Sequence, residues 1–189
     1  MDIKSIFKMP KPVNITGRTS TITNSFINSF IPVIPPKEEE IIRVLEILKL
    51  EPDDLKCAYC GDKSSEWDHF RPLVKDKRPT GFISEIYNLV PSCGKCNQSK
   101  GNREWREWIL SEAPRSPKSR NVKELNQKIK CLETFERWKN IKPIDFEKIV
   151  GVEVMKTHWK NLEEMWQMMK KSQKLAEEIK TKIQPKRRR

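Results

Sequence analysis

Two short cysteine pairs, Cys57-Ala-Tyr-Cys60 and Cys93-Gly-Lys-Cys96, decide how this chain folds. Two C-x-x-C pairs in a chain without a visible secretory signal are typical of a tetrahedral Zn²⁺ site with four thiolate ligands. Structural zinc contributes about 10–16 kcal/mol in small peptides, comparable with the whole stability of a domain, about 5–15 kcal/mol. We therefore expect zinc to replace part of the hydrophobic core, and a set of redox thiols is the alternative.

The segment between the two pairs predicts a small sheet followed by a helix. Residues 67–70 form a short, half-apolar run that predicts a strand ending before Pro72. Residues 83–90 predict a second strand, which Pro91 ends. Tryptophans at helical spacing follow Cys96, so the expected order is strand, long loop, strand, helix.

Three polar residues converge if zinc joins the cysteine pairs. Asn97 follows Cys96 directly, and Asp68-His69 lies on the neighbouring strand. Carboxylate and amide oxygens suit Mg²⁺ or Mn²⁺, and an imidazole can take a proton from water near neutral pH. Adjacent strand residues point to opposite faces, so Asp68 and His69 share a site only where the strand ends or bulges. The alternatives are a surface Asp-His pair and a helix-capping Asn97.

The order of these residues resembles the HNH nuclease family, whose zinc-supported members have the ββα-metal fold. The resemblance covers about residues 55–110. The residues that carry it are Cys57, Cys60, Asp68, His69, Asn88-Leu89-Val90, Cys93, Cys96, Asn97 and Lys100-Gly101-Asn102.

The resemblance implies a role for each residue of the motif. His69 is then the general base that activates water, and Asp68 and Asn97 bind a catalytic Mg²⁺ or Mn²⁺. Asn88 positions the His69 loop through backbone hydrogen bonds. The four cysteines hold zinc that does no chemistry. Many members have His where this chain has Asn97, so this is an H-N-N variant, and its products would carry 5′-phosphate and 3′-hydroxyl ends.

Basic residues near the motif are candidates for nucleic-acid contacts. Lys100 and Arg103 follow Asn97 on the expected helix and are expected to hold backbone phosphate. Arg71 and Lys75 are weaker candidates, and Lys75 opens a basic loop, residues 75–81, that could approach a groove. The alternative for all four is a solvated surface charge.

Composition agrees with a nucleic-acid partner. The 189 residues include 38 Lys and Arg against 26 Asp and Glu, a net charge of +12. Such an excess favours a polyanion, although a solvated surface without a partner is equally compatible. The sequence has no long apolar run and no signal-peptide pattern, so a cytoplasmic protein is expected.

The flanks of the motif read as helices. We expect an N-terminal arm with helices at residues 1–54, the zinc-supported nuclease core at 55–110, a basic linker at 111–121 and a helical region at 122–189. The fold class is therefore α+β, mostly helical. The long helix from about Met155 to Ile183 either packs on the domain or forms a dimer seam. Residues 186–189 form a basic tail that could hold phosphate non-specifically, whereas Cys131 and His158 read as structural.

Together these features predict a metal-dependent endonuclease that cuts double-stranded DNA with His-activated water. A type II restriction or anti-phage defence role is expected, with a homodimer and a companion methyltransferase or defence protein as partners. A homing or toxin-type nuclease is the alternative within the same chemistry. A zinc-ribbon nucleic-acid-binding protein without catalysis is the alternative from another class.

Overall fold

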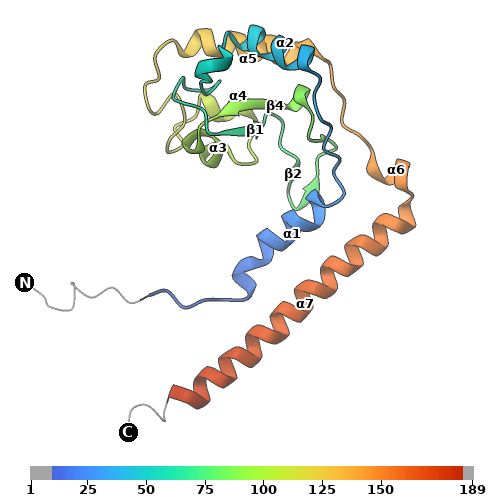
Figure 1. The fold of residues 1–189 in the computed structure, drawn as a ribbon. Coiled ribbons are helices and arrows are strands. Elements are labelled where there is room, and N and C mark those ends of the chain that lie inside the picture. Colours follow the sequence, from blue (N-terminus) through green and yellow to red (C-terminus); the bar gives the residue numbers. More distant parts are fainter. Residues whose placement is uncertain (1–9, 185–189) are drawn as a thin grey trace, which may run out of the picture. The chain divides into compact units, whose positions relative to one another are not determined.

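The computed structural model describes residues 10–184 and groups them into two compact units (Figure 1). The core unit is Ile27–Phe146. The helical unit combines the described parts of Met1–Phe26 and Glu147–Arg189. The basic tail at residues 186–189, for which phosphate binding was expected, lies outside the described residues.

Two antiparallel strands and a short helix lie at the centre of the core unit. β1 (Glu66–His69) pairs with β4 (Leu89–Ser92), so that Glu66 is opposite Ser92 and His69 is opposite Leu89. α3 (Gly94–Lys100) follows β4 almost at once. The ββα order and the α+β, mostly helical fold class are confirmed.

Aromatic side chains pack the helices onto this sheet. Phe70, directly after β1, stacks on Trp105 of α4 (Trp105–Ile109) with ring centroids 5.1 Å apart. Phe70 also meets Phe135 of α5 (Leu125–Trp138) edge-on at 5.2 Å. The buried Tyr59 ring contacts Trp108 at 5.1 Å. α2 (Glu38–Leu48) packs against α5. Phe70 at the end of β1 is therefore packed between α4 and α5.

The second strand of the sheet differs from the expected one in both bounds. It begins only at Leu89, because Ile86–Asn88 form the 3-10 turn η4. It also continues through Pro91, which was expected to end it. The Pro91 carbonyl accepts a hydrogen bond from Ala58 N at 2.8 Å, on the side away from β1. The nitrogen of a strand residue points to the same side as its carbonyl, so no ladder hydrogen bond is lost at Pro91.

The basic segment expected to be a loop is a tight β-hairpin. β2 (Val74–Lys75) pairs with β3 (Arg78–Pro79), and Lys75 lies opposite Arg78. The two turn residues Asp76 and Lys77 have φ of 50° and 62°, the left-handed values that a two-residue type I′ turn requires. Lys75 is exposed on this hairpin.

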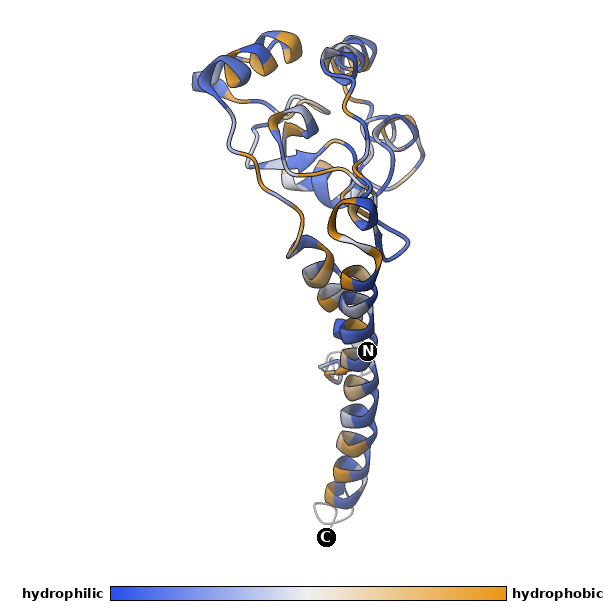
Figure 2. Ribbon diagram, turned by 90° about the vertical axis from the view of Figure 1, so that its right-hand side faces the viewer, coloured by the Kyte–Doolittle hydropathy of each residue, from blue (hydrophilic) through white to orange (hydrophobic). Residues whose placement is uncertain are grey.

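The helical unit is built around α7 (Val152–Ile183). Its buried residues Met155, Leu162 and Met169 recur every seven positions and mark one face of the helix. Ile15 N donates a hydrogen bond to Gln173 Oε1 at 2.8 Å, so the N-terminal segment lies along this helix. Figure 2 shows apolar residues recurring along the whole of α7.

Shorter helical elements complete both units. α7 is preceded by the short helix α6 (Phe146–Val150). The 3-10 turn η2 (Thr16–Arg18) leads directly into α1 (Thr19–Asn28). His158 Nε2 of α7 lies 3.0 Å from the carbonyl oxygen of Phe26 in α1. The 3-10 turn η3 (Pro52–Asp54) follows α2. Within residues 10–184, no helix is long and apolar enough to cross a membrane.

Candidate functional site

The four paired cysteines form one cluster. Cys57 and Cys60 lie in the loop before β1, whereas Cys93 and Cys96 lie at the start of α3. Their sulfur atoms all lie within 4.8 Å of one another, and Cys60 Sγ and Cys93 Sγ are 3.6 Å apart. Tetrahedral zinc with Zn–S bonds of about 2.3 Å places sulfurs about 3.8 Å apart. The donor set and its spacing therefore fit a tetrahedral metal ion.

A segment far along the chain covers this cluster. Arg120 lies in the stretch expected to be a linker, and its Nη2 donates to Cys96 Sγ at 3.1 Å. Its Nη1 also lies 3.4 Å from Oδ2 of Asp62, two residues after Cys60. Ser99 Oγ of α3 donates to the Pro114 carbonyl at 2.6 Å. The guanidinium of Arg120 thus lies where it would offset the negative charge of metal-bound thiolates.

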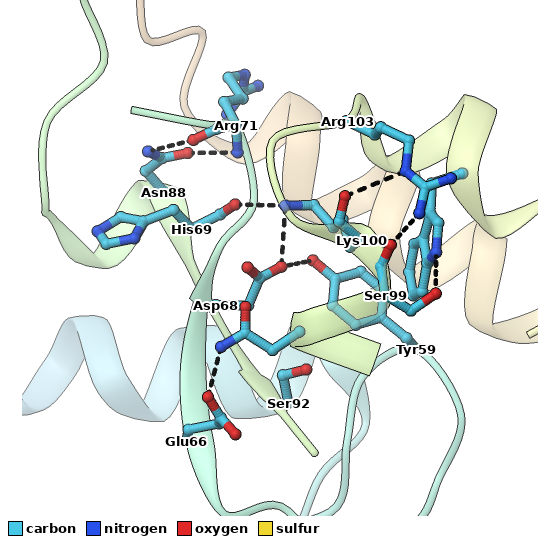
Figure 3. A network of polar contacts seen from close by, with 12 residues as sticks. Tyr59, Glu66, Asp68, His69, Arg71, Asn88, Ser92, Ser99, Lys100 and Arg103 are labelled. Atoms are coloured by element: carbon cyan, nitrogen blue, oxygen red, sulfur yellow. Dashed lines mark hydrogen bonds and ion pairs between the residues drawn. The ribbon is translucent and has the colours of Figure 1, made fainter. Parts of the chain in front are cut away.

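Asp68 is buried on one side of β1 (Figure 3). Its Oδ2 accepts a hydrogen bond from the Tyr59 hydroxyl at 2.6 Å and an ion pair from Lys100 Nζ at 3.0 Å. Burial raises the pKa of Asp68, and the charge of Lys100 and the Tyr59 hydrogen bond oppose that rise. Burial and the negative charge of Asp68 raise the pKa of Tyr59, so Tyr59 stays a hydrogen-bond donor. Oδ1 is the carboxylate oxygen that neither partner uses.

The position of Lys100 contradicts the expectation that it contacts a backbone phosphate. Its ammonium group is fully buried, where it pairs with Asp68 and donates to the His69 carbonyl at 2.7 Å. A cation with no exposure to solvent cannot reach a phosphate on the surface. Lys100 instead joins α3 to the end of β1.

His69 is the last residue of β1, and its ring points away from Asp68 (Figure 3). Nε2 lies 2.8 Å from Ser84 Oγ in the loop before β4. Burial, and then the charge of Lys100, lower the pKa of His69 below its usual value. The imidazole is therefore neutral at pH 7, as a general base must be. The strand ends here as expected, yet the side chains of Asp68 and His69 lie on opposite sides.

Asn88 fixes the loop that follows His69. It is completely buried, and its Oδ1 accepts from Arg71 N at 2.8 Å. Its Nδ2 donates to the carbonyls of Arg71 at 3.1 Å and Ile83 at 3.2 Å. These bonds tie the exit of β1 to the entry of β4, the two places that hold His69 and Ser84.

Asn97 contacts a residue that the sequence interpretation had left out. Its Nδ2 donates to Glu66 Oε2 at 2.5 Å. Glu66 and Asp68 are two positions apart on β1 and so share one face of the strand. The structure therefore brings Asn97 to the face that carries Asp68. The alternation along the strand was the signal in the sequence that could have identified Glu66.

The other basic candidates divide into inward and outward groups. Arg71 is turned into the protein, because its Nη2 donates to the Glu136 carbonyl at 3.2 Å and its guanidinium lies 5.5 Å from the Phe82 ring. Burial lowers the pKa of Arg71, and the phosphate contact expected of this partly buried residue stays a prediction. Arg103 and Lys75 are exposed. Arg103 bonds the Lys100 carbonyl at 3.3 Å and so also closes the end of α3.

The oxygen donors on this face fit a hard divalent cation. Asp68 offers Oδ1, and Asn97 offers its amide oxygen, because its nitrogen is engaged by Glu66. Mg²⁺ is commonly held by one or two protein oxygens together with waters and phosphate oxygens. Among residues 10–184, the one group of three or more His, Cys, Asp or Glu arranged to hold a metal is the cysteine cluster. A cation beside Asp68 would thus depend on substrate and water for its other ligands.

Comparisons with known proteins agree with this geometry. The family model described as HNH endonuclease matches residues 57–103, which include the cysteine cluster, His69, Asn88 and Asn97. The CRISPR-associated endonuclease Cas9 of Corynebacterium diphtheriae is 40% identical over 57 residues. That stretch is 28% of this chain and 5% of the Cas9 chain, so the chain spans a small part of its relative. No solved structure matches the chain. The matched residues support a nuclease.

Proposed function

We propose that the HNH endonuclease domain at residues 57–103 makes this protein a divalent-metal-dependent nuclease that cuts double-stranded DNA. The observation that carries the proposal is the family match, which falls on a ββα element with His69 at the end of β1 and the oxygen donors of Asp68 and Asn97 on the other face of that strand. Asp68 and Asn97 would hold Mg²⁺ or Mn²⁺, and the four cysteines would hold structural zinc.

His69 supplies the general base in this proposal. When His69 Nε2–H donates a hydrogen bond to Ser84 Oγ across their 2.8 Å contact, Nδ1 keeps its lone pair and can take a proton from water. Asn88 and Ser84 keep the ring in that orientation, since both hold the loops around it. The water then attacks the phosphorus in line, opposite the leaving 3′ oxygen.

The two metals have separate tasks. A divalent cation held by Asp68 and Asn97 would supply charge stabilisation to the phosphate and the leaving oxygen. The cysteine cluster uses all four positions of a tetrahedral ion for protein ligands, which leaves none for chemistry. Zinc at this cluster would instead hold the loop before β1 against α3, and therefore hold Asn97 near Asp68.

A cleavage assay with a matched histidine control tests the proposal. Supercoiled plasmid is incubated with the protein and Mg²⁺ or Mn²⁺, beside His69→Ala and His158→Ala. The chain has two histidines, so His158→Ala makes the same chemical change in α7. His69→Ala is expected to lower the cleavage rate by about 10²–10⁴-fold, and His158→Ala to leave it unchanged. Equal cleavage by His69→Ala, or none by the parent, would favour a zinc-ribbon binding protein without catalysis.

The biological role proposed is that of a type II restriction or anti-phage defence deoxyribonuclease that acts as a homodimer. One active site per chain supports the dimer, because cutting both strands calls for two sites. Sequencing the ends of products from a defined DNA tests the role, with structured RNA as a parallel substrate. A fixed motif supports restriction, whereas scattered ends support a non-specific effector of the homing or toxin type.

A further inference from the structure

Glu66 is an exposed acidic residue that the proposed mechanism does not use, yet it touches one of the proposed metal ligands. Its Oε2 lies 2.5 Å from Asn97 Nδ2, although the two residues are 31 positions apart in the chain. Its other oxygen, Oε1, lies over the first residue of α3, where a Cβ added to Gly94 would come within 2.9 Å of it. The carboxylate is therefore seated between Gly94 and Asn97.

This contact decides which end of the Asn97 amide faces Glu66. An ionised carboxylate only accepts hydrogen bonds, so the NH₂ group of Asn97 must point toward it. The amide is planar, and its oxygen is thereby directed away from Glu66 Oε2. Without such a partner, an Asn side chain can present either its nitrogen or its oxygen to a site.

The orientation matters because a cation binds the oxygen and is repelled by the NH₂ group. Asp68 lies on the same face of β1 as Glu66, two residues further along. Lys100 and Tyr59 occupy Oδ2 of Asp68, so Asp68 contributes little beyond Oδ1. A cation held by so few protein oxygens depends strongly on the amide oxygen of Asn97.

We propose that Glu66 is a positioning residue that locks the Asn97 carboxamide with its oxygen toward the divalent cation. This inference rests on the proposed function, because it assigns the Asp68–Asn97 face to a metal ion. A conserved hydrogen-bond partner of a metal ligand typically changes metal affinity by about 10–100-fold.

Metal binding without DNA tests the role of Glu66. The zinc-loaded full chain is titrated with Mn²⁺, and free Mn²⁺ is followed by its electron paramagnetic resonance signal. Glu66→Gln is expected to weaken Mn²⁺ binding about 10-fold, because a Gln side chain can also donate and so no longer selects one orientation of Asn97. Glu66→Asp keeps the charge but loses the reach, and a similar loss is expected. Glu107→Gln, an exposed change on α4, should leave the affinity within about 2-fold.

A double-variant cycle separates positioning from direct binding or charge. Asn97→Asp replaces the amide with a carboxylate, which presents oxygen in either orientation. Glu66→Gln should therefore change Mn²⁺ affinity by less than about 2-fold in the Asn97→Asp background. The same 10-fold loss in both backgrounds would mean that Glu66 binds the metal itself and would overturn the inference. Parental affinity in Glu66→Gln, or in Glu66→Asp, would also overturn it.

Cleavage of plasmid provides the second readout. The rate of Glu66→Gln at saturating Mn²⁺ should return close to the parental rate, because His69 and Asp68 are unchanged. If the parent binds Mn²⁺ and cuts DNA while Glu66→Gln behaves as the parent in both assays, this inference fails and the proposed function stands. If the parent neither binds Mn²⁺ nor cuts, both are overturned together.

Discussion

Lys100 shows how one buried charge can tie a site together. Its ammonium group bridges the Asp68 carboxylate and the His69 carbonyl, at 3.0 and 2.7 Å. Two of the proposed functional residues therefore depend on a side chain that touches no substrate. A buried ion pair adds little net stability compared with an apolar pair, but removal of one partner leaves the other charged and buried.

The first prediction concerns this ion pair. Lys100→Met should lower the free energy of unfolding by about 3–5 kcal/mol, because the Asp68 carboxylate then lacks its buried counter-charge. Urea denaturation followed by tryptophan fluorescence measures the change. Lys95→Met, which changes an exposed lysine of the same helix, is the control and should change stability by about 0.5 kcal/mol or less. A Lys100→Met variant with parental stability and weaker DNA binding would support the phosphate contact instead.

Tyr87 links η4 to α2 through a hydrogen bond to a carboxylate. Its hydroxyl donates to Glu40 Oε1 in a short hydrogen bond. That bond lowers the pKa of Glu40 and, together with burial, raises the pKa of Tyr87 to about 12. The unfolded tyrosine ionises near pH 10. The contribution of this bond is therefore complete below pH 10 and is lost as the pH rises through about 12.

The second prediction follows from that shift. In the folded protein, the absorbance change of tyrosinate at 295 nm should show no step at pH 10. Tyr87→Phe should remove the transition near pH 12 and lower stability slightly at pH 7, because the lost hydrogen bond lies at the surface. The stability of the parent and of Tyr87→Phe should converge as the pH rises from 10 to 12. A tyrosine step at pH 10 in the folded parent contradicts this prediction.

At the scale of elements, α3 places three kinds of residue within two turns. Cys96 belongs to the cysteine cluster, Asn97 lies on the face of β1 that carries Asp68, and Lys100 forms the buried ion pair. Seven residues form too short a helix to be stable alone. The helix is instead fixed by the cysteines at its start and by Arg120 and Pro114 of the segment that covers it.

The third prediction tests that covering segment. Arg120→Gln should speed the transfer of zinc to a chromogenic chelator several-fold, because the guanidinium offsets the negative charge on Cys96 Sγ. Arg115→Gln is the matched control, since Arg115 lies in the same segment and contacts Gln98 instead of a cysteine. Equal rates for both variants would show that Arg120 covers the cluster without stabilising it.

At the scale of the whole molecule, the positive charge divides unevenly between the two units. Residues 27–146 contain 22 Lys and Arg against 19 Asp and Glu. The remaining residues contain 16 Lys and Arg against 7 Asp and Glu. Most of the net +12 therefore lies outside the unit that carries the proposed site. The helix α7 itself carries seven exposed lysines against five glutamates. Long-range attraction of DNA is expected to come mainly from the helical unit.

The fourth prediction is a difference in salt dependence. Replacement of Lys170, Lys171 and Lys174 by Gln should reduce the slope of log K against log salt for DNA binding by up to about 3. The control replaces three exposed lysines of the core unit, Lys37, Lys49 and Lys130, and should leave the slope nearly unchanged. Both sets should keep the parental rate of cleavage at saturating DNA. An equal reduction of the slope in the two sets would contradict this prediction, because lysines of the core unit would then contribute to DNA binding as much as those of α7.

The sequence alone predicted a chemistry for the site, because ligand type and spacing are local properties of the chain. The paired cysteines predicted the cluster, and the Asp68-His69, Asn88 and Asn97 pattern predicted residues that the fold places around one ββα element. The α+β class followed from the same segment. The long helix at Val152–Ile183 was also predictable, since its period of apolar residues is local.

Only the tertiary structure decided which charged residues face inward. In the sequence, Lys100 and Arg71 look no different from the exposed Arg103 and Lys75. Their partners, Asp68 and Glu136, lie 32 and 65 positions away in the chain. Glu66 likewise gains its role from Asn97, 31 positions further on. Burial and hydrogen-bond geometry are properties of contacts between distant segments, so no local pattern determines them. The sequence determined which residue types are available to the site, and the packing of α3 against β1 decided which side chains hold it in place.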